Sequence, residues 1–128
     1  MIVADSDVLI DALRGRDPAM ARVASGLRAG ILATTAVSVF ELRAGARPGR
    51  ERDTVDLLLG GLTILPFDEA AAVAAADVRR ELEDGGQAIG MADYLIAGIC
   101  IARSAVLVTR NRRHFERVSG LVLGELDS

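Results

Sequence analysis

The stretch Met1-Ile-Val-Ala-Asp5-Ser-Asp7-Val-Leu-Ile10 decides the fold of this chain. A short apolar run ends abruptly in two carboxylates, and an apolar helical pattern follows at once, which predicts a buried strand, a polar turn and a helix. Ligands of open α/β sheets lie outside the carboxyl ends of the strands, and Asp5 is predicted to stand at such an end. Two aspartates separated by one residue suit a divalent cation better than an apolar core.

Strands and helices alternate along the rest of the 128 residues, which is typical of a parallel sheet wrapped by helices. Strands are expected over 1–4, 31–33, 62–65, 105–108 and 121–123. Helices are expected over 7–14, 17–30, 37–45, 53–59, 68–83 and 90–103. We therefore predict an α/β fold, a three-layer α/β/α domain with a central, mainly parallel sheet, in which residues 1–128 form a single domain.

The composition narrows the classes of protein. The formal net charge of −3 does not by itself suggest a nucleic-acid binder, although acids that gather at one metal site would distort that number. No apolar run approaches the roughly 18 residues of a membrane span, and no signal peptide is expected. Cys100 is the only cysteine, so a reducing, cytoplasmic location is expected. All 15 basic residues are arginines.

Polar residues follow three of the predicted strands, at the edge where a parallel sheet gathers the carboxyl ends of its strands. They are Asp5-Ser6-Asp7, Thr34-Thr35 and Thr109-Arg110-Asn111. Glu41 lies less than two turns into the helix after the second strand, and Asp93 lies in the first turn of the helix over 90–103. Asp5, Glu41 and Asp93 are therefore expected to converge at this edge.

Each acid also has a purely structural interpretation. Ser6 or either neighbouring aspartate can cap the first helix, and Ser38 with Glu41 fits a capping box. Asp93 suits a helix N-terminus, but it interrupts an otherwise apolar helix, and no basic residue occurs between positions 85 and 101. Because an unpaired buried charge is expensive, a metal ion shared by Asp93, Asp5 and Glu41 is the alternative interpretation.

Oxygen ligands without a nearby His or Cys favour Mg²⁺, with Mn²⁺ as the alternative. A cation of this kind suppresses repulsion between carboxylates, holds a phosphate, activates a water and stabilises a leaving oxygen. Those are the requirements of phosphodiester hydrolysis, so the three acids favour a metal-dependent hydrolase.

Four segments of the chain resemble the PIN-domain ribonucleases, and specifically the small VapC-like toxins of bacterial toxin–antitoxin pairs. The segments occur in family order, span nearly the whole chain, and read Val3-Ala-Asp5-Ser-Asp7-Val-Leu-Ile10, Thr35-Ala-Val-Ser-Val-Phe-Glu41-Leu-Arg43-Ala-Gly45, Ile89-Gly-Met-Ala-Asp93-Tyr-Leu-Ile-Ala97 and Leu107-Val-Thr109-Arg-Asn111-Arg-Arg-His-Phe115. One segment alone is a weak signal, whereas four in order are specific.

The resemblance implies that Asp5, Glu41 and Asp93 are the catalytic acids of a Mg²⁺-dependent ribonuclease. In many relatives the segment that matches 109–115 supplies a fourth acid, and this chain departs from that pattern. Its accessory candidates are Thr109, Asn111, which can position a water, and His114, which can act on a proton or be an exposed surface imidazole. Asp7 either strengthens the site or caps the helix.

The resemblance also implies two partners. RNA is expected to meet the arginines beside the site, because arginine suits bidentate phosphate contacts; the candidates are Arg43, Arg110, Arg112 and Arg113. A cognate VapB-like antitoxin is expected to silence a homodimer of the toxin, as a heterotetramer or larger assembly. The groove on the toxin that receives the antitoxin is predicted to be lined by apolar residues. For most of these residues the alternative interpretation is ordinary core packing; they are Val8, Leu9, Ala12, Leu13, Leu57 and Leu58.

Two other functions compete with this interpretation. A haloacid-dehalogenase-like phosphatase uses two aspartates that are spaced as Asp5 and Asp7 are. That chemistry usually also needs a lysine near the phosphate, and this chain has no lysine. The same objection applies to a response-regulator receiver domain. A non-catalytic PIN module that only binds RNA or a partner is favoured by the missing fourth acid and opposed by the complete set of three.

Overall fold

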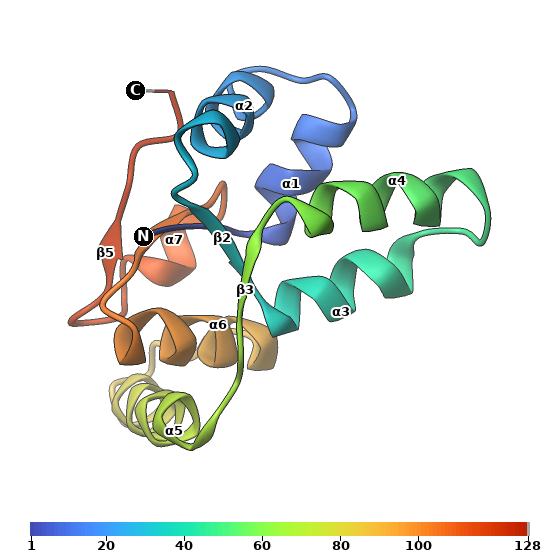
Figure 1. The fold of residues 1–128 in the computed structure, drawn as a ribbon. Coiled ribbons are helices and arrows are strands. Elements are labelled where there is room, and N and C mark those ends of the chain that lie inside the picture. The colour runs from blue at the N-terminus through green and yellow to red at the C-terminus, as the bar shows by residue number, and fades with distance from the viewer. Residues whose placement is uncertain (128) are drawn as a thin grey trace.

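The chain forms a five-stranded sheet in which every neighbouring pair of strands is parallel (Figure 1). The structure, a computed structural model, describes residues 1–127. The strands are β1 (Ile2–Ala4), β2 (Leu32–Thr35), β3 (Thr63–Leu65), β4 (Val106–Val108) and β5 (Val122–Leu123). Their order across the sheet is β3-β2-β1-β4-β5, so the N-terminal strand is the central one. The predicted α/β fold with a parallel sheet is confirmed.

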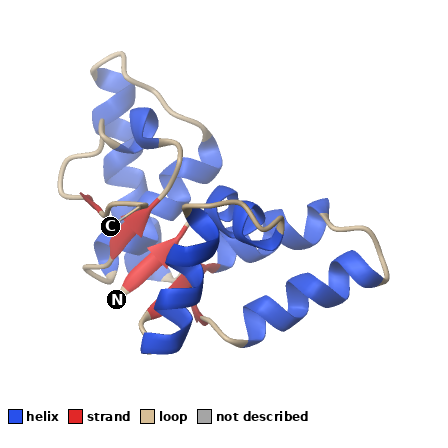
Figure 2. Ribbon diagram, turned by 90° about the horizontal axis from the view of Figure 1, so that it is seen from above, coloured by secondary structure: helices blue, strands red, loops and turns tan. Residues whose placement is uncertain are grey.

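Helices cover both faces of the sheet, which makes three layers (Figure 2). The helices are α1 (Ser6–Leu13), α2 (Ala19–Ala29), α3 (Ala36–Gly45), α4 (Arg50–Gly60), α5 (Glu69–Asp84), α6 (Met91–Ala102) and α7 (Arg112–Phe115). Alternate residues of a strand point to opposite faces: Val3 packs with α5, α6 and α7, whereas Ala4 packs with α1 to α4. Over residues 1–127, none of these helices is both long and apolar enough to cross a membrane.

The strand register brings the first and the fourth strand to a common end. Ala4 is the register partner of Val108, so Asp5 and Thr109 leave the sheet side by side although 104 residues separate them. The backbone N–H of Asp5 donates to the carbonyl of Val108 at 3.0 Å, which continues the ladder one step beyond β1. The carboxyl edge of the sheet therefore holds two of the three polar segments that the sequence predicts there.

The third predicted segment, Thr34-Thr35, belongs to β2 itself, and the expected end of that strand at Ala33 was wrong. Both threonines are fully buried, and the Thr34 hydroxyl donates to the carbonyl of Ala4 at 2.7 Å. A hydroxyl that is hydrogen-bonded to the neighbouring strand can lie inside a sheet at little energetic cost, so these residues serve the core.

Asp5 was one of the three candidates for the cap of α1 and is confirmed, whereas the capping box predicted for α3 was wrong. Asp5, and neither Ser6 nor Asp7, is the N-cap of α1, because its side chain accepts from the backbone N–H of Ser6. Thr35 is the N-cap of α3 and accepts from the backbone N–H of Ser38 at 3.0 Å. Ser38 is therefore the third residue of the helix, and the predicted capping box with Glu41 does not form.

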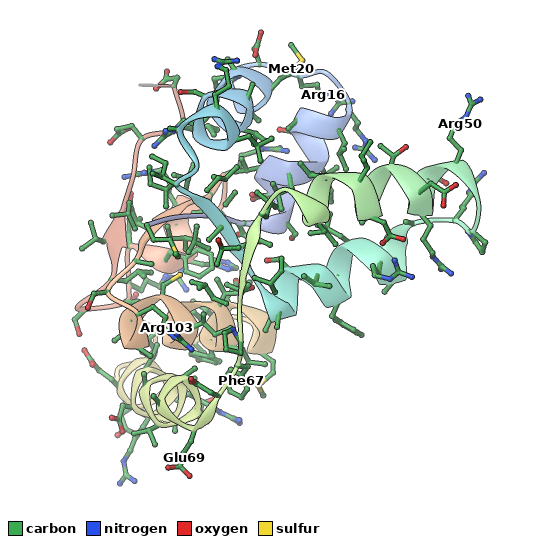
Figure 3. All side chains as sticks on the ribbon, viewed as in Figure 1. Arg16, Met20, Arg50, Phe67, Glu69 and Arg103 are labelled. Carbon is green, nitrogen blue, oxygen red and sulfur yellow. The ribbon has the colours of Figure 1, made fainter. Side chains whose placement is uncertain are left out.

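One helix begins earlier than expected by more than two residues, and one short helix was not expected. Helix α4 begins at Arg50, three residues before the predicted start, and α7 has only four residues, which is too short for helical periodicity to reveal it. Arg50 projects from the outer end of the α3–α4 hairpin, which extends away from the sheet (Figure 3).

Helices α5 and α6 pack unusually closely because Gly98 of α6 has no side chain. A Cβ atom at Gly98 would lie 2.5 Å from the carbonyl oxygen of Ala71 and 2.7 Å from the backbone nitrogen of Ala75. Those atoms belong to the α5 backbone, which cannot rotate away as a flexible side chain can. The contact fixes α6, and with it Asp93, against the rest of the molecule.

We expect Gly98→Ala to destabilise the protein by about 1–3 kcal/mol, because overpacking a tight core forces the backbone to shift. Urea denaturation of the variant and the wild type measures the difference. Gly60→Ala is the matched control, since no atom lies within 4 Å of a Cβ at Gly60 and its φ is not in the left-handed region. Equal stability of Gly98→Ala and wild type would contradict the close packing of α5 and α6.

Candidate functional site

Asp5 is the centre of the site. It follows β1 directly and caps α1, so the strand and the helix together fix its backbone. Its side chain is 6% exposed. One carboxylate oxygen, Oδ1, accepts from the N–H of Ser6 at 2.8 Å, and the other, Oδ2, accepts from the hydroxyl of Thr109 at 2.8 Å. No basic side chain bonds to this buried carboxylate within the described part of the chain.

The surroundings of Asp5 oppose its negative charge. Burial is the largest cause, and the charges of Asp7 and Asp93 add to it, so that the pKa of Asp5 is raised from 3.8 to about 7. The hydrogen bonds from Thr109 and Ser6 act in the opposite direction but are outweighed. A raised pKa of this kind in a group of carboxylates is typical of a functional site.

Glu41 reaches Asp5 through Ser6. The hydroxyl of Ser6 donates to Oε1 of Glu41 at 3.2 Å, while the backbone N–H of the same serine donates to Asp5. Glu41 lies in the second turn of α3, is half-buried, and has no capping role there. Ser6 thus connects two of the predicted acids, a contribution that sequence reasoning missed because a serine beside an aspartate looks like an ordinary cap.

Asp93 is held by two of the three accessory candidates from the segment after β4, Asn111 and His114. Its Oδ2 lies 2.8 Å from Nδ1 of His114 and 3.4 Å from Nδ2 of Asn111. Nδ2 of Asn111 and Nδ1 of His114 are also 2.9 Å apart. His114 is 40% exposed and bonded, so it is not the isolated surface imidazole of the alternative interpretation. Thr109, whose hydroxyl accepts from the N–H of Asn111 at 3.0 Å, links this group to Asp5.

Asp7 faces the segment after β4 instead of the other acids. Its carboxylate accepts from the backbone N–H of Arg110 at 3.2 and 3.4 Å. Burial is the largest influence on Asp7 and raises its pKa, while the bond from Arg110 lowers it. Asp7 is therefore neither the helix cap nor a bonded neighbour of Asp5, although its charge acts on that carboxyl.

The four arginines that the sequence assigns to RNA differ in their partners. Arg110 pairs with Asp11 at 2.9 Å, and Arg43 forms an ion pair with Asp56. Arg112 donates to the carbonyl of Gly124 and lies 3.6 Å from Glu116. Arg113 is exposed and has no hydrogen-bond or ion-pair partner among residues 1–127. Sequence reasoning missed Asp11, whose only signal was its place four residues after Asp7 in an apolar helix.

The donor chemistry of the site suits a divalent cation. Asp5, Glu41 and Asp93 offer only carboxylate oxygens, which Mg²⁺ and Mn²⁺ prefer. The three do not close around one point: among the described residues, no three His, Cys, Asp or Glu side chains gather closely enough to hold an ion between them. The charge of Asp93 nevertheless acts directly on Asp5, and Glu41 is one serine away. A cation would offset the repulsion that raises the pKa of Asp5.

We expect Asp5→Asn to be more stable than the wild type at pH 8 in EDTA, and the difference to shrink toward pH 4. The folded protein ionises Asp5 only near pH 7, whereas the unfolded chain does so near 3.8. The folded wild type therefore loses stability relative to the variant as the pH rises from about 4 to about 7, and no further above that window. Urea denaturation of both proteins across this pH range measures the difference, and a pH-independent difference would contradict the raised pKa.

The chain matches the model of one protein family, the PIN domain, over residues 2–121. Among curated proteins it is similar to the tRNA(fMet)-specific endonuclease VapC of Shigella flexneri, with 32% identity over 91% of each chain. It is also similar to ribonuclease VapC10 of Mycobacterium tuberculosis, with 38% identity over 90% of this chain and 86% of that one.

Solved structures agree with these relatives. VapBC from Salmonella typhimurium bound to DNA superposes with a TM-score of 0.86 at 25% identity, covering 98% of this chain and 97% of that chain. VapBC2 from Rickettsia felis, bound to a DNA fragment from its promoter, superposes with a TM-score of 0.85 at 27% identity, covering 97% and 98%. The parallel sheet, the acids at its carboxyl edge and these similarities lead to one conclusion: the chain belongs to the PIN-domain family, among its VapC ribonucleases.

Proposed function

We propose that this VapC-family ribonuclease is a Mg²⁺-dependent endoribonuclease in which Asp5, Glu41 and Asp93 hold the cation and form the catalytic centre. The observation that carries the proposal is Asp5, a buried carboxylate whose charge is opposed by burial and by two neighbouring acids. A group that is stable in this place only when protonated or beside a cation is suited to metal binding.

A divalent cation at such a site supplies positive charge to the scissile phosphate and lowers the pKa of a water molecule. The protein holds the three carboxylates in position. Thr109 holds one oxygen of Asp5, Ser6 connects Asp5 with Glu41, and Asn111 orients Asp93. Asp7 and His114 act around this centre: Asp7 holds the backbone after β4, and His114 contacts the same oxygen of Asp93 as Asn111 does.

His114 and Asn111 occupy the place from which many relatives supply a fourth acid. We propose that Asn111 positions a water for attack through its amide, and that His114 exchanges a proton with the reacting groups. The contact of both side chains with Oδ2 of Asp93, one of the proposed catalytic acids, supports these roles.

For RNA contact we propose Arg113 first among the four arginines. Its guanidinium is exposed and without a partner in the described chain, and it lies one helical turn or less from Asn111 and His114. Arg43, Arg110 and Arg112 already bond to groups of their own chain, so they would have to exchange those bonds for phosphates. With only four aromatic side chains in the sequence, substrate choice rests on RNA backbone and shape more than on stacking.

We further propose that the protein is a toxin that forms a homodimer and is silenced by a cognate VapB-like antitoxin, in a heterotetramer or larger assembly. Support comes from a cavity of about 360 Å³ between α1, α3 and α4, whose lining includes the apolar Ile10, Leu13 and Leu42 together with Glu41. Of the residues expected to form a groove, Val8 and Leu9 are core, Leu13 lines this cavity, and Leu57 is 83% exposed.

The two alternative functions have less support. The phosphatase needs Asp5 and Asp7 to act together on a phosphate, whereas Asp7 bonds to the backbone of Arg110. The non-catalytic module is opposed by the presence of all three acids and by the bonds that order them.

We expect the wild type to cleave RNA in Mg²⁺ and to lose cleavage in excess EDTA, and Asp93→Asn to be inactive. Mg²⁺ is expected to raise the melting temperature of the wild type, because a ligand that binds only the folded state stabilises it, and the variant is expected to lose most of that increase. Gel assays of RNA cleavage and thermal unfolding with and without Mg²⁺ measure both effects.

Asp77→Asn is the control, since Asp77 is an exposed acid of α5 without a bonded partner among residues 1–127. It is expected to keep both the cleavage and the Mg²⁺-dependent increase in melting temperature. An equal increase in Asp93→Asn and wild type would show that Asp93 is only a helix-terminal residue.

We expect Arg113→Ala to weaken RNA binding and to reduce the slope of log K against log salt by about 0.7, the loss of one contact to single-stranded RNA. Fluorescence anisotropy over a range of salt concentrations measures the slope. Arg80→Ala is the matched control, because Arg80 is also an exposed arginine of a helix, α5, and has no hydrogen-bond or ion-pair partner in the described part of the chain. Equal slopes in the two variants would make Arg113 an ordinary surface residue.

A further inference from the structure

The segment 109–111 bonds to the side chains of both Asp5 and Asp93. Its first residue, Thr109, bonds to Asp5, and its last residue, Asn111, bonds to Asp93. The two are tied together by the bond from the Asn111 N–H to the Thr109 hydroxyl at 3.0 Å. A shift of this segment therefore moves the supports of two acids at once.

Arg110, between them, is the residue by which this segment is fastened to α1. Its backbone N–H donates to Asp7, and Nη1 of its side chain donates to Oδ2 of Asp11 at 2.9 Å. Asp7 and Asp11 are four residues apart on α1 and therefore lie on one face of the helix. One arginine is thus held at two points, by its main chain and by its guanidinium, on the helix that Asp5 caps.

Asp11 is unsuited to a role as an ordinary surface acid. Its side chain is 13% exposed, whereas that of Arg110 is 53% exposed. Its second oxygen, Oδ1, is buried and has no hydrogen-bond partner among the described residues, with Arg16 Nη1 at 3.9 Å. A carboxylate with so little access to water depends on its ion pair, and Arg110 supplies the one hydrogen-bonded cation.

We propose that Asp11 and Arg110 are positioning residues: their ion pair holds the segment 109–111 on α1 and thereby sets the spacing between Asp5 and Asp93. In this role Arg110 binds the protein and not the RNA. The inference rests on the proposed function, since the spacing matters for catalysis only if the two acids act together. It assigns a role to Asp11, which touches none of the three acids.

The test compares Asp11→Asn, Arg110→Gln and the double variant with the wild type. Each single change is expected to lower kcat by about tenfold or more, because a misplacement on the order of 1 Å at reacting groups can cost on the order of 100-fold. KM is expected to stay within about twofold, since the RNA contacts are untouched. The double variant is expected to be no worse than the poorer single one, because both remove the same ion pair.

Arg110→Lys separates positioning from general damage, because a lysine retains a cation for the single contact with Asp11 and is expected to keep most of kcat. Arg103→Gln is the matched control. Arg103 makes the same kind of single contact, Nη2 to Asp68 at 2.9 Å, at the far end of α6 (Figure 3), and its loss is expected to leave kcat unchanged. Thermal unfolding tests whether each variant is folded. If Arg110→Gln does not fold, the comparison of Asp11→Asn with Arg110→Lys tests the proposal instead.

A second readout does not depend on nuclease activity. Amide hydrogen exchange, measured by NMR in EDTA, is expected to quicken at Arg110 and Asn111 in both single variants and to stay unchanged in Arg103→Gln. If the wild type cleaves no RNA, the proposed function fails, and this exchange alone decides the positioning role.

The competing role for Arg110 predicts the opposite pattern. If Arg110 contacts RNA, Arg110→Gln raises KM and flattens its salt dependence, whereas Asp11→Asn leaves KM unchanged or lowers it, because the arginine is released toward phosphate. That result overturns the proposal. An Asp11→Asn variant with wild-type kcat and wild-type amide exchange also overturns it.

Discussion

The hydrogen bond from the Thr109 hydroxyl to the Asp5 carboxylate is the interaction on which the rest of the site depends. Asp5 must remain at the end of the central strand, where burial and two neighbouring acids oppose its charge. Among the described residues only two donors offset that opposition, and one of them, Thr109, lies 104 residues further along the chain. The parallel pairing of β1 with β4 is what brings that donor within 2.8 Å.

This constraint explains why most polar side chains near the site share hydrogen bonds with one another. Ser6 bonds to Asp5 and Glu41, and Asn111 bonds to Asp93 and Thr109. Networks of this kind are worth more when every member is satisfied, because each bond orients the next. The small residues of the site, and not only its acids, therefore determine how the carboxylates face one another.

The sequence was sufficient for the strand–helix order because each short apolar run ends in residues that a strand cannot easily continue. It was insufficient where a polar residue, which usually marks the end of a strand, is buried and hydrogen-bonded inside the sheet. Thr34 looks like the end of a strand, yet its hydroxyl finds the carbonyl of Ala4 on the neighbouring strand. The place of Asp5 and Asp93 at the carboxyl edge followed from topology, whereas the pairing of Asp11 with Arg110 joins residues 99 apart and had no local signal.

The order of the strands also determines when, during synthesis, the residues of the site can come together. The ribosome makes β1 and β2 before β4, so the central strand has a sheet partner on only one side until residues 106–108 have been synthesised. A nascent or truncated chain that lacks 109–115 carries Asp5, Glu41 and Asp93 without the threonine, asparagine and histidine that hold two of them. Synthesis of residues 109–115 thus completes the hydrogen-bond network of the candidate site.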